Sequence, residues 1–279
     1  MQVIIQPDDG LTPNVKAIRR ARKSLDIVIF RFDLSDLEDA LATAVERGVA
    51  VRALIAHTNR GGEKKLRKLE DRLLKCGATL SRTANDMVRY HGKVIVIDNK
   101  RAFVLGFNFT ALDIRKSRSL GLVTTNPKIV AAITKVIDAD HNRVPPVVTS
   151  PRLVVSPENA REQLSSFIRG ARRELLIYDA NLTDDRIIAL LMQRAAAGVK
   201  VRVLGSLERK WKDTGIKVKD MRGLRLHVRA IVRDGKAAFV GSQSLRKLEL
   251  DKRREVGLIT KDKRAVAKIA RTFEADWDA

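Results

Sequence analysis

The sequence predicts an α/β protein made of two similar lobes, each with a parallel or mixed sheet flanked by helices. Two observations support this fold class. First, the chain contains an internal repeat, because residues 1–52 and 151–202 align without gaps at an offset of 150. Second, strand-like and helix-like segments alternate within each copy, which is typical of sheets covered by helices.

The first copy is expected to read strand, helix, strand, helix, strand. Pro13 in a first turn, Ser35 as a cap and Gly48 as a terminator mark the helix ends. The expected elements are a strand at 3–5, a basic amphipathic helix at 12–23, a buried strand at 25–30, a helix at 35–47 and a strand at 49–55. The second copy repeats the last three at 175–178, 184–197 and 199–204.

A second block of the repeat aligns at the shorter offset of 136. It matches 94–97 with 230–233, 102–105 with 238–241 and 120–124 with 256–260, and a closing helix follows each copy at 128–141 and 262–277. The change of offset from 150 to 136 gives the first copy about fourteen extra residues between Ile55 and His91. Separately, residues 64–75 show the apolar stripe of a basic amphipathic helix. The prolines in 143–148 stiffen a connection. We therefore predict a first lobe at 1–143, a linker at 144–150 and a second lobe at 151–279.

Composition narrows the function classes. The 279 residues include 55 Lys and Arg against 33 Asp and Glu, a formal net charge of +22, which points to a polyanionic partner such as nucleic acid or anionic lipid. A single cysteine, Cys76, excludes an intramolecular disulfide framework and fits a reducing compartment. Neither a membrane-spanning apolar stretch nor a secretory signal is present. We expect a cytoplasmic protein rather than a transmembrane enzyme or a disulfide-stapled secreted domain.

Two of the four histidines, His91 and His227, fall at equivalent places in the repeat. Each begins an apolar strand-like run, His91-Gly92-Lys93-Val94-Ile95-Val96-Ile97-Asp98 and His227-Val228-Arg229-Ala230-Ile231-Val232-Arg233-Asp234. Residues i and i+2 of a strand project from one face, so each histidine lies beside a cation, Lys93 or Arg229. An imidazole next to a fixed positive charge suits phosphoryl transfer without a metal.

These two segments resemble the HKD motif of the phospholipase D superfamily, a pattern of the form H-x-K-x4-D-x6-G-[S/G]-x-N. The resemblance covers nearly the whole chain and indicates the two-lobed, single-chain form with a variant second motif, HxR. It implies two lobes that face each other across one active site, and a phosphodiesterase that needs no metal or cofactor.

The family mechanism implies a role for each matching residue. One histidine attacks phosphorus to form a phosphohistidine, the other protonates the leaving oxygen, and the family's usual order favours His91 as the nucleophile. Lys93 and Arg229 would hold the non-bridging oxygens of the phosphate, and Asn108 would add a hydrogen bond.

The sequence departs from the family pattern in both copies. Arg229 replaces a lysine, and its planar fork is not interchangeable with an ammonium. Ser244 stands where the second asparagine belongs, and Leu105 stands where the first copy should have a glycine. We still expect Gly106, Ser242 and Ser244 to help bind the substrate.

Three carboxylates lie in or near the motifs, namely Glu255, Asp98 and Asp234. Glu255 lies 28 residues after His227, where the family places a carboxylate that orients an imidazole, whereas the equivalent residue after His91 is Ser119. If Glu255 pairs with His227, the imidazolium form of His227 is favoured and His227 is the better acid. We expect Asp98 and Asp234 either to support the site or to form the hairpin turns that follow the two strand-like runs.

Basic residues flank the second motif. Lys210, Trp211 and Lys212 combine cations with an aromatic ring, which suits a groove that tracks a nucleic-acid backbone and stacks a base. Arg246, Lys247, Lys252, Arg253 and Arg254 would extend the rim of that groove.

The sequence therefore predicts a monomeric nuclease that acts on single strands or ends. Two alternatives stay open. One is a phospholipase D or a cardiolipin-synthase-like phosphatidyltransferase that docks on anionic membranes. The other is a catalytically impaired nucleic-acid-binding protein whose second lobe has lost its catalytic residues.

Overall fold

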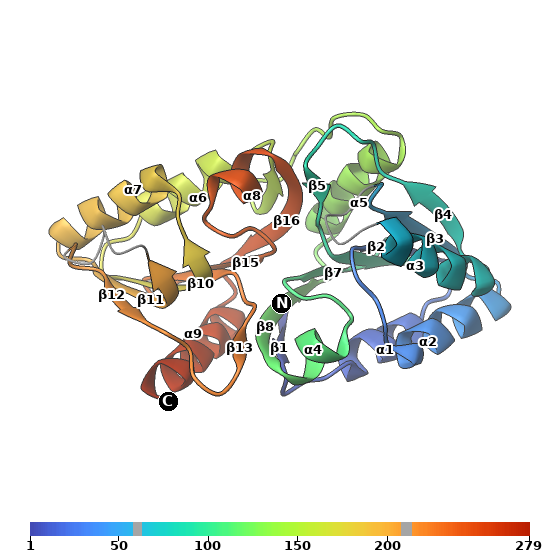
Figure 1. Ribbon diagram of the computed structural model, residues 1–279, viewed down its shortest axis with the longest axis horizontal. Coiled ribbons are helices and arrows are strands. Elements are labelled where there is room, and N and C mark those ends of the chain that lie inside the picture. The colour runs from blue at the N-terminus through green and yellow to red at the C-terminus, as the bar shows by residue number, and fades with distance from the viewer. Residues whose placement is uncertain (58–62, 208–213) are drawn as a thin grey trace.

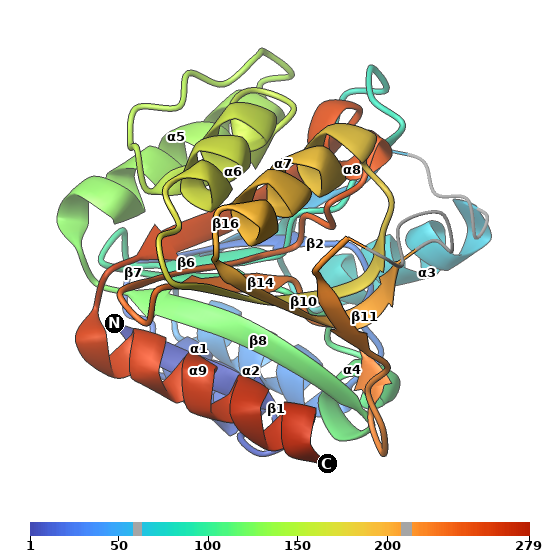
Figure 2. The same cartoon turned by 90° about the vertical axis from the view of Figure 1, so that its left-hand side faces the viewer.

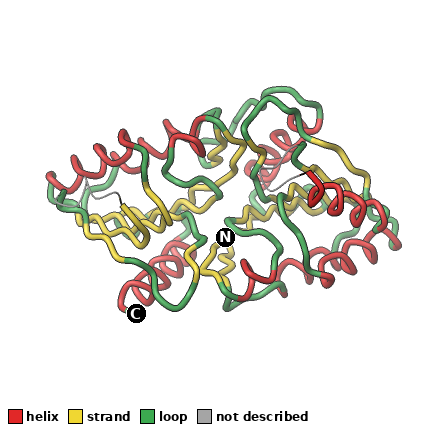
Figure 3. Tube along the Cα trace, viewed as in Figure 1, coloured by secondary structure: helices red, strands yellow, loops and turns green. Residues whose placement is uncertain are grey.

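The structure is a computed structural model that describes residues 1–57, 63–207 and 214–279. Two lobes lie side by side, the first formed by the N-terminal half of the chain and the second by the C-terminal half (Figure 1). In both lobes the strands lie between layers of helices (Figure 3). The predicted α/β class and the duplication of the lobes are confirmed.

The first sheet has the order β1-β8-β7-β6-β2-β3-β4, with β13 paired to β8 outside this path. β2, β3 and β4 are parallel, whereas β6 runs antiparallel to β2, so the sheet is mixed. Its first-lobe strands are β1 (Gln2–Gln6), β2 (Ser24–Ile29), β3 (Ala50–Ile55), β4 (Thr79–Arg82), β6 (Val94–Ile97), β7 (Arg101–Leu105) and β8 (Ser117–Thr124).

The second sheet repeats this arrangement in the order β12-β11-β10-β14-β15-β16-β5, with β9 paired to β16. Its second-lobe strands are β9 (Leu153–Ser156), β10 (Glu174–Leu182), β11 (Lys200–Leu207), β12 (Lys217–Lys219), β14 (Ala230–Arg233), β15 (Ala237–Gly241) and β16 (Arg253–Thr260).

Each lobe lends one short strand to the sheet of the other lobe. β5 (Arg89–Tyr90) runs parallel to β16, and β13 (Arg225–Leu226) runs parallel to β8. His91 and His227 follow these strands directly, so the exchange carries each histidine to the other lobe.

The helices of the first lobe are α1 (Thr12–Arg19), α2 (Ser35–Glu46), α3 (Glu63–Lys75), α4 (Ala111–Arg115) and α5 (Pro127–His141). Those of the second are α6 (Ala160–Arg169), α7 (Asp185–Ala196), α8 (Lys247–Asp251) and α9 (Lys263–Asp278). Figure 2 shows α9 alongside β8 and β1, and Lys268 of α9 donates a hydrogen bond to the carbonyl of Val3 at 3.1 Å.

One hydrophobic core is common to both lobes. Ile133 of α5, Ile269 and Phe273 of α9, Leu122 of β8 and Leu258 of β16 all belong to it and are at most 1% exposed. Separate cores lie on the outer faces, under α1, α2 and α3 in the first lobe and under α6, α7 and α8 in the second. Burial of a continuous apolar core is the main force that holds the lobes together.

Ion pairs at the lobe interface repeat the duplication. Arg254 is 2% exposed in its side chain and bonds Asp140 of α5 at 3.0 Å. Its equivalent in the first lobe, Arg118, bonds Asp276 of α9 at 2.8 Å. These four residues are related by the offset of 136, so each lobe reaches into the closing helix of the other.

Most predicted elements form within a few residues of their expected bounds, with two differences in the first two helices. α1 ends at Arg19 rather than at residue 23, because the carboxylate of Asp98 accepts hydrogen bonds from the backbone N–H groups of Arg22, Lys23 and Ser24. Ser35 does not cap α2, whose cap position is Leu34 with no side-chain hydrogen bond.

Candidate active site between the lobes

The first histidine contacts a carboxylate of the other lobe. Register pairs of β5 and β16 join Tyr90 to Arg254, so the next residues along each strand, His91 and Glu255, lie together. The Nδ1 atom of His91 is 3.0 Å from both carboxylate oxygens of Glu255, which is fully buried. The expected pairing of Glu255 with His227 is therefore wrong, because the exchanged strand carries His91 to Glu255.

The second histidine has different neighbours at the equivalent place. The backbone N–H of His227 donates to the carbonyl of Arg118 at 3.1 Å, which brings the ring beside Ser119. The Oγ of Ser119 lies 3.5 Å from Nδ1 of His227, at the limit of a hydrogen bond. The nearest carboxylate oxygen belongs to Asp113 of α4, at 3.4 Å from the same nitrogen.

The two cations make matching contacts. Lys93, 1% exposed, donates from Nζ to the carbonyl of His91 at 2.7 Å. Arg229 donates from Nη1 to the carbonyl of His227 at 2.8 Å and from Nε to the Oγ of Ser244 at 3.1 Å. The arginine therefore keeps the carbonyl contact of the lysine, and its larger fork is bound by the shorter serine.

Burial governs the charge of the site. It lowers the pKa of His91 to about 4, although Glu255 opposes the shift. It also lowers the pKa of Lys93 to about 7. The pKa of His227 is lowered further by burial and by the nearby charges of Arg229 and Lys93. Both imidazoles are neutral at pH 7, where Lys93 is about half protonated, and the guanidinium of Arg229 leaves the site suited to an anion.

Glu255 remains ionised beside His91. Burial acts to raise its pKa, but His91, Lys93 and a hydrogen bond from Ser242 lower it below the ordinary value. An ionised acceptor at Nδ1 of His91 selects the tautomer with the proton on Nδ1. Nζ of Lys93 lies 2.9 Å from Nε2 and 3.0 Å from Nδ1 of the same ring, beside both nitrogens rather than along the Nε2 lone pair.

Asn108 is hydrogen-bonded to Asp113. Its backbone N–H and its Nδ2 donate to Oδ2 of Asp113, at 2.9 and 2.7 Å. Its Oδ1 is buried and has no hydrogen-bond partner among the described residues. Among the described residues, Nδ2 makes this one hydrogen bond, and the predicted hydrogen bond to a phosphate stays a prediction.

The glycine and serine positions lie at the seam between the lobes. A Cβ on Gly106 would come within 2.9 Å of the carbonyl of Leu120 and 3.0 Å of that of Gly241, which explains the glycine. The Oγ of Ser242 accepts from the backbone N–H of Val256 at 3.2 Å, next to Glu255. The roles of Gly106, Ser242 and Ser244 in substrate binding stay predictions.

Asp98 and Asp234 bind backbone in the hairpin turns. Both have positive φ angles, 54° and 55°. Asp98 binds the start of β2, and Asp234 accepts from the backbone N–H groups of Arg172, Arg173 and Glu174 in the same way. These contacts connect the β6–β7 and β14–β15 turns to neighbouring strands, away from the imidazoles.

The basic rim is only partly described. Lys210, Trp211 and Lys212 lie outside the described residues. Two of the arginines expected to extend the rim are committed elsewhere, since Arg254 is buried against Asp140 and Arg253 bonds Glu249 at 2.7 Å. The expectation that Arg254 lines an open groove is wrong, because its guanidinium joins the lobes.

Two neighbours of the histidines were missed from the sequence. The ring of Phe30, at the end of β2, meets that of His91 edge-on at a centroid distance of 4.8 Å. Asp113 contacts His227 as described above. The repeat could have drawn attention to Asp113, because at the offset of 136 this residue aligns with another acid, Glu249.

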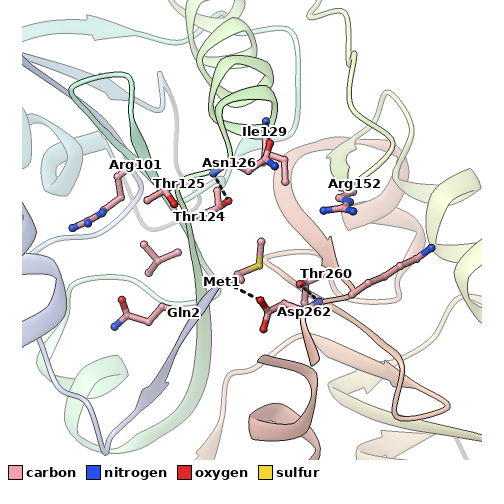
Figure 4. A pocket seen from close by; sticks show the side chains of 12 residues that line it. Met1, Gln2, Arg101, Thr124, Thr125, Asn126, Ile129, Arg152, Thr260 and Asp262 are labelled. Carbon is pink, nitrogen blue, oxygen red and sulfur yellow. Dashed lines mark hydrogen bonds and ion pairs between the residues drawn. The ribbon is translucent and has the colours of Figure 1, made fainter. Parts of the chain in front are cut away.

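A separate groove of about 740 Å³ opens where β8 and β16 end (Figure 4). Arg101 and Arg152 lie on opposite sides of it in Figure 4, with Thr124 and Thr260 between them. None of the residues predicted for the site lines this groove. No described helix is long and apolar enough to cross a bilayer.

Comparisons with known proteins agree with this architecture. A family model described as "Cardiolipin synthase, PLD-like domain" matches residues 15–141 and 164–277. No curated protein matches the chain in sequence.

Solved structures with a similar fold have different printed functions. Polyphosphate kinase from Porphyromonas gingivalis is 19% identical with a TM-score of 0.80, and the match covers 99% of this chain and 50% of the kinase. The chain thus spans half the length of that protein. Phosphatidylserine synthase from Haemophilus influenzae is 10% identical with a TM-score of 0.75, covering 99% of this chain and 86% of the synthase.

Nuc, a phospholipase D family member from Salmonella typhimurium, matches about half of this chain. The two are 25% identical with a TM-score of 0.45, and the match covers 53% of this chain and 97% of Nuc. The assignment rests on the family model, which covers most of both lobes and spans both histidine motifs. The chain therefore belongs to the PLD-like domain family.

Proposed function

We propose that the chain is a metal-independent phosphodiesterase that cleaves nucleic acid, with single strands or ends as substrates, through a phosphohistidine. The observation that supports this most is the convergence of His91 and His227, with Lys93 and Arg229, at one site between the lobes. Two neutral imidazoles beside the Arg229 guanidinium and Lys93, an amine that a bound phosphate anion favours in its protonated form, supply a nucleophile, a proton carrier and a binding place for a phosphate.

The first step would transfer the phosphoryl group to His91. Glu255 holds the Nδ1 proton, so the Nε2 lone pair can attack phosphorus while Lys93 binds the phosphate beside the ring. The N–P bond forms while the bond to the leaving oxygen breaks, and His227, protonated when the phosphate anion enters, gives its proton to that oxygen. Lys93 and Arg229 stabilise the charge on the non-bridging oxygens.

The second step would restore the enzyme. His227, now neutral, takes a proton from water as the water oxygen attacks phosphorus. The N–P bond breaks and its electron pair returns to Nε2 of His91, which releases a phosphate monoester. The proton remains on His227 for the next cycle.

Charge favours nucleic acid as the substrate. A formal net charge of +22 suits a polymer of phosphates, whose binding releases counterions at each contact. Only 12 of 279 residues are aromatic, which leaves few side chains for a membrane-interface belt.

A phosphatidyltransferase is the second candidate, because the matching family model is described as cardiolipin synthase. The first step would be the same, with a phosphatidyl group carried on His91. An alcohol rather than water would then give up its proton to His227 and attack phosphorus.

The test uses purified full-length chain in EDTA with labelled single-stranded DNA, single-stranded RNA and duplex DNA, and in parallel with phosphatidylglycerol vesicles. We expect single strands to be cut, with the activity lost in His91→Ala and His227→Ala and kept in His57→Ala, a control outside the site. Headgroup exchange in the vesicles without any nuclease activity would favour the transferase. Salt-sensitive DNA binding that survives both substitutions, with no turnover of either substrate, would identify a binding protein instead.

A further inference from the structure

The duplicated site lacks one of its two strand carboxylates. In the second lobe, Glu255 of β16 contacts Nδ1 of His91 across the interface at 3.0 Å. The equivalent residue of β8 is Ser119, whose hydroxyl lies 3.5 Å from Nδ1 of His227. A hydroxyl carries no charge, so Ser119 cannot balance a proton on the second ring.

A carboxylate from another element reaches this ring. Oδ1 of Asp113, in α4, lies 3.4 Å from Nδ1 of His227, and the Asp113 side chain is 4% exposed. Asp113 stands six residues before Ser119 in the chain, so the acid comes from the helix that precedes β8 rather than from the strand.

The Asp113 carboxylate is held in place by bonds from three sides. Its Oδ2 accepts from the backbone N–H and the Nδ2 of Asn108 at 2.9 and 2.7 Å. Its own backbone N–H donates to Oγ1 of Thr110, the cap of α4, at 3.2 Å. Arg225 donates to the same Oδ1 that faces His227, and also to Ser117 at 2.9 Å. A buried carboxylate with these donors has little freedom to turn.

The repeat shows that this contact is particular to the first lobe. Glu249 of α8 aligns with Asp113 at the offset of 136. Glu249 is also buried, but it bonds Arg253 at 2.7 Å and Arg246 at 3.5 Å within its own lobe. Glu249 therefore bonds two arginines, whereas Asp113 bonds Arg225 and also lies beside a histidine whose strand acid is missing.

We propose that Asp113 is the positioning residue of His227 and does for this ring what Glu255 does for His91. The inference rests on the proposed function, in which His227 carries the proton of the leaving group. Asp113 holds the Nδ1 proton of His227, so that Nε2 faces the substrate, and its charge stabilises the imidazolium. Four cationic or titratable groups act against that imidazolium, namely Arg229, Lys93, Arg225 and His91.

The kinetic test compares Asp113→Asn with its repeat-matched control Glu249→Gln on two substrates. An oligonucleotide has a leaving oxygen that needs a proton, whereas the p-nitrophenyl ester of thymidine 5′-monophosphate has one that leaves without it. We expect Asp113→Asn to slow cleavage of the oligonucleotide about 100-fold and that of the ester less than about threefold. Glu249→Gln should change both rates by the same factor. Equal losses on both substrates in Asp113→Asn would overturn the proposal.

A rescue experiment tests the transfer of the role between positions. Adding Ser119→Glu to Asp113→Asn places a carboxylate at the equivalent of Glu255. We expect it to recover at least about tenfold in oligonucleotide cleavage, and no recovery would count against a purely electrostatic and orienting role.

A measurement on the resting protein separates this inference from the proposed function. Imidazole ¹⁵N spectra of the wild type should show the His227 proton on Nδ1, and Asp113→Asn should shift it toward Nε2 while Glu249→Gln does not. A wild-type His227 protonated on Nε2 would overturn the inference even if Asp113→Asn does not fold. A wild type that cleaves no phosphodiester would overturn the proposed function, and the spectra would still decide the role of Asp113.

Discussion

The carboxylate of Glu255 lies 3.0 Å from Nδ1 of His91, although the two residues belong to different lobes. The contact depends on β5 of the first lobe joining β16 of the second. Neither lobe alone contains both the ring and its acceptor, so the first histidine can be oriented only when the lobes are assembled.

Glu255→Gln should therefore slow the reaction more than any stability loss explains. A glutamine can still accept from Nδ1, but it no longer balances the positive charge that His91 gains as it is phosphorylated. We expect the acid-labile phosphoenzyme to form up to about 100-fold more slowly, measured in a single turnover. Ser119→Ala, the repeat-matched control, should stay within about threefold, and a Glu255→Gln enzyme that is equally active would contradict this role.

Lys93 should make the stability of the protein depend on pH. Burial lowers its pKa from 10.5 to about 7, so between these values the unfolded chain holds a proton that the folded chain lacks. Stability then rises as the pH is raised through this window, by at most about 1.4 kcal/mol per pH unit. Urea unfolding at pH 7, 8 and 9 should show the wild type gaining stability relative to Lys93→Met. Parallel curves for the two proteins would mean that the lysine keeps its ordinary pKa.

The sequence was sufficient for the parts of the site that lie close together along the chain. His91 and Lys93 are two residues apart in the link between β5 and β6, and His227 and Arg229 occupy the same places between β13 and β14, so local spacing predicts that each pair lies together although neither pair is in a strand. The repeat likewise predicts the two similar sheets. The prediction of the elements was less good where tertiary contacts intervene, as where Asp98 ends α1 early by binding the backbone at residues 22–24.

The contacts between lobes could not be predicted in this way. Spacing along the chain assigns Glu255 to His227, whereas the exchanged strands assign it to His91. Asp113 belongs to no motif, and its contact with His227 joins residues 114 positions apart, from 113 to 227. Such pairings depend on how β13 and β5 cross the interface, which a pattern within one copy does not encode.

The two substitutions in the second motif should be coupled. Arg229 bonds Ser244 at 3.1 Å, whereas the first lobe has Lys93 and Asn108 at these positions. Arg229→Lys alone leaves Ser244 without its donor and a gap where the fork lay, so we expect a clear loss of activity. Arg229→Lys with Ser244→Asn should recover part of that loss, with a coupling of about 0.5–3 kcal/mol in a double-mutant cycle on kcat/KM. Additive effects would show that the two positions act independently.

The interface arginines should contribute unequally to stability. Arg254→Met leaves Asp140 and Glu158 without their cation in a place where the arginine is 2% exposed, so we expect a loss of about 3–5 kcal/mol. Arg118→Met should cost less, because Arg118 is 11% exposed and Asp276 keeps a hydrogen bond from Tyr178. Exposed Lys261→Met should stay within about 0.5 kcal/mol.

The pH dependence of that loss identifies its cause. Burial raises the pKa of Asp140 to about 7 even beside Arg254, so without the arginine this carboxyl should take up a proton more readily. Protonation removes the buried charge, and the penalty of Arg254→Met should therefore be smaller at pH 6 than at pH 8.5. Urea unfolding at the two pH values measures the difference. A penalty that does not change with pH would mean that the arginine stabilises the interface through packing rather than by balancing Asp140.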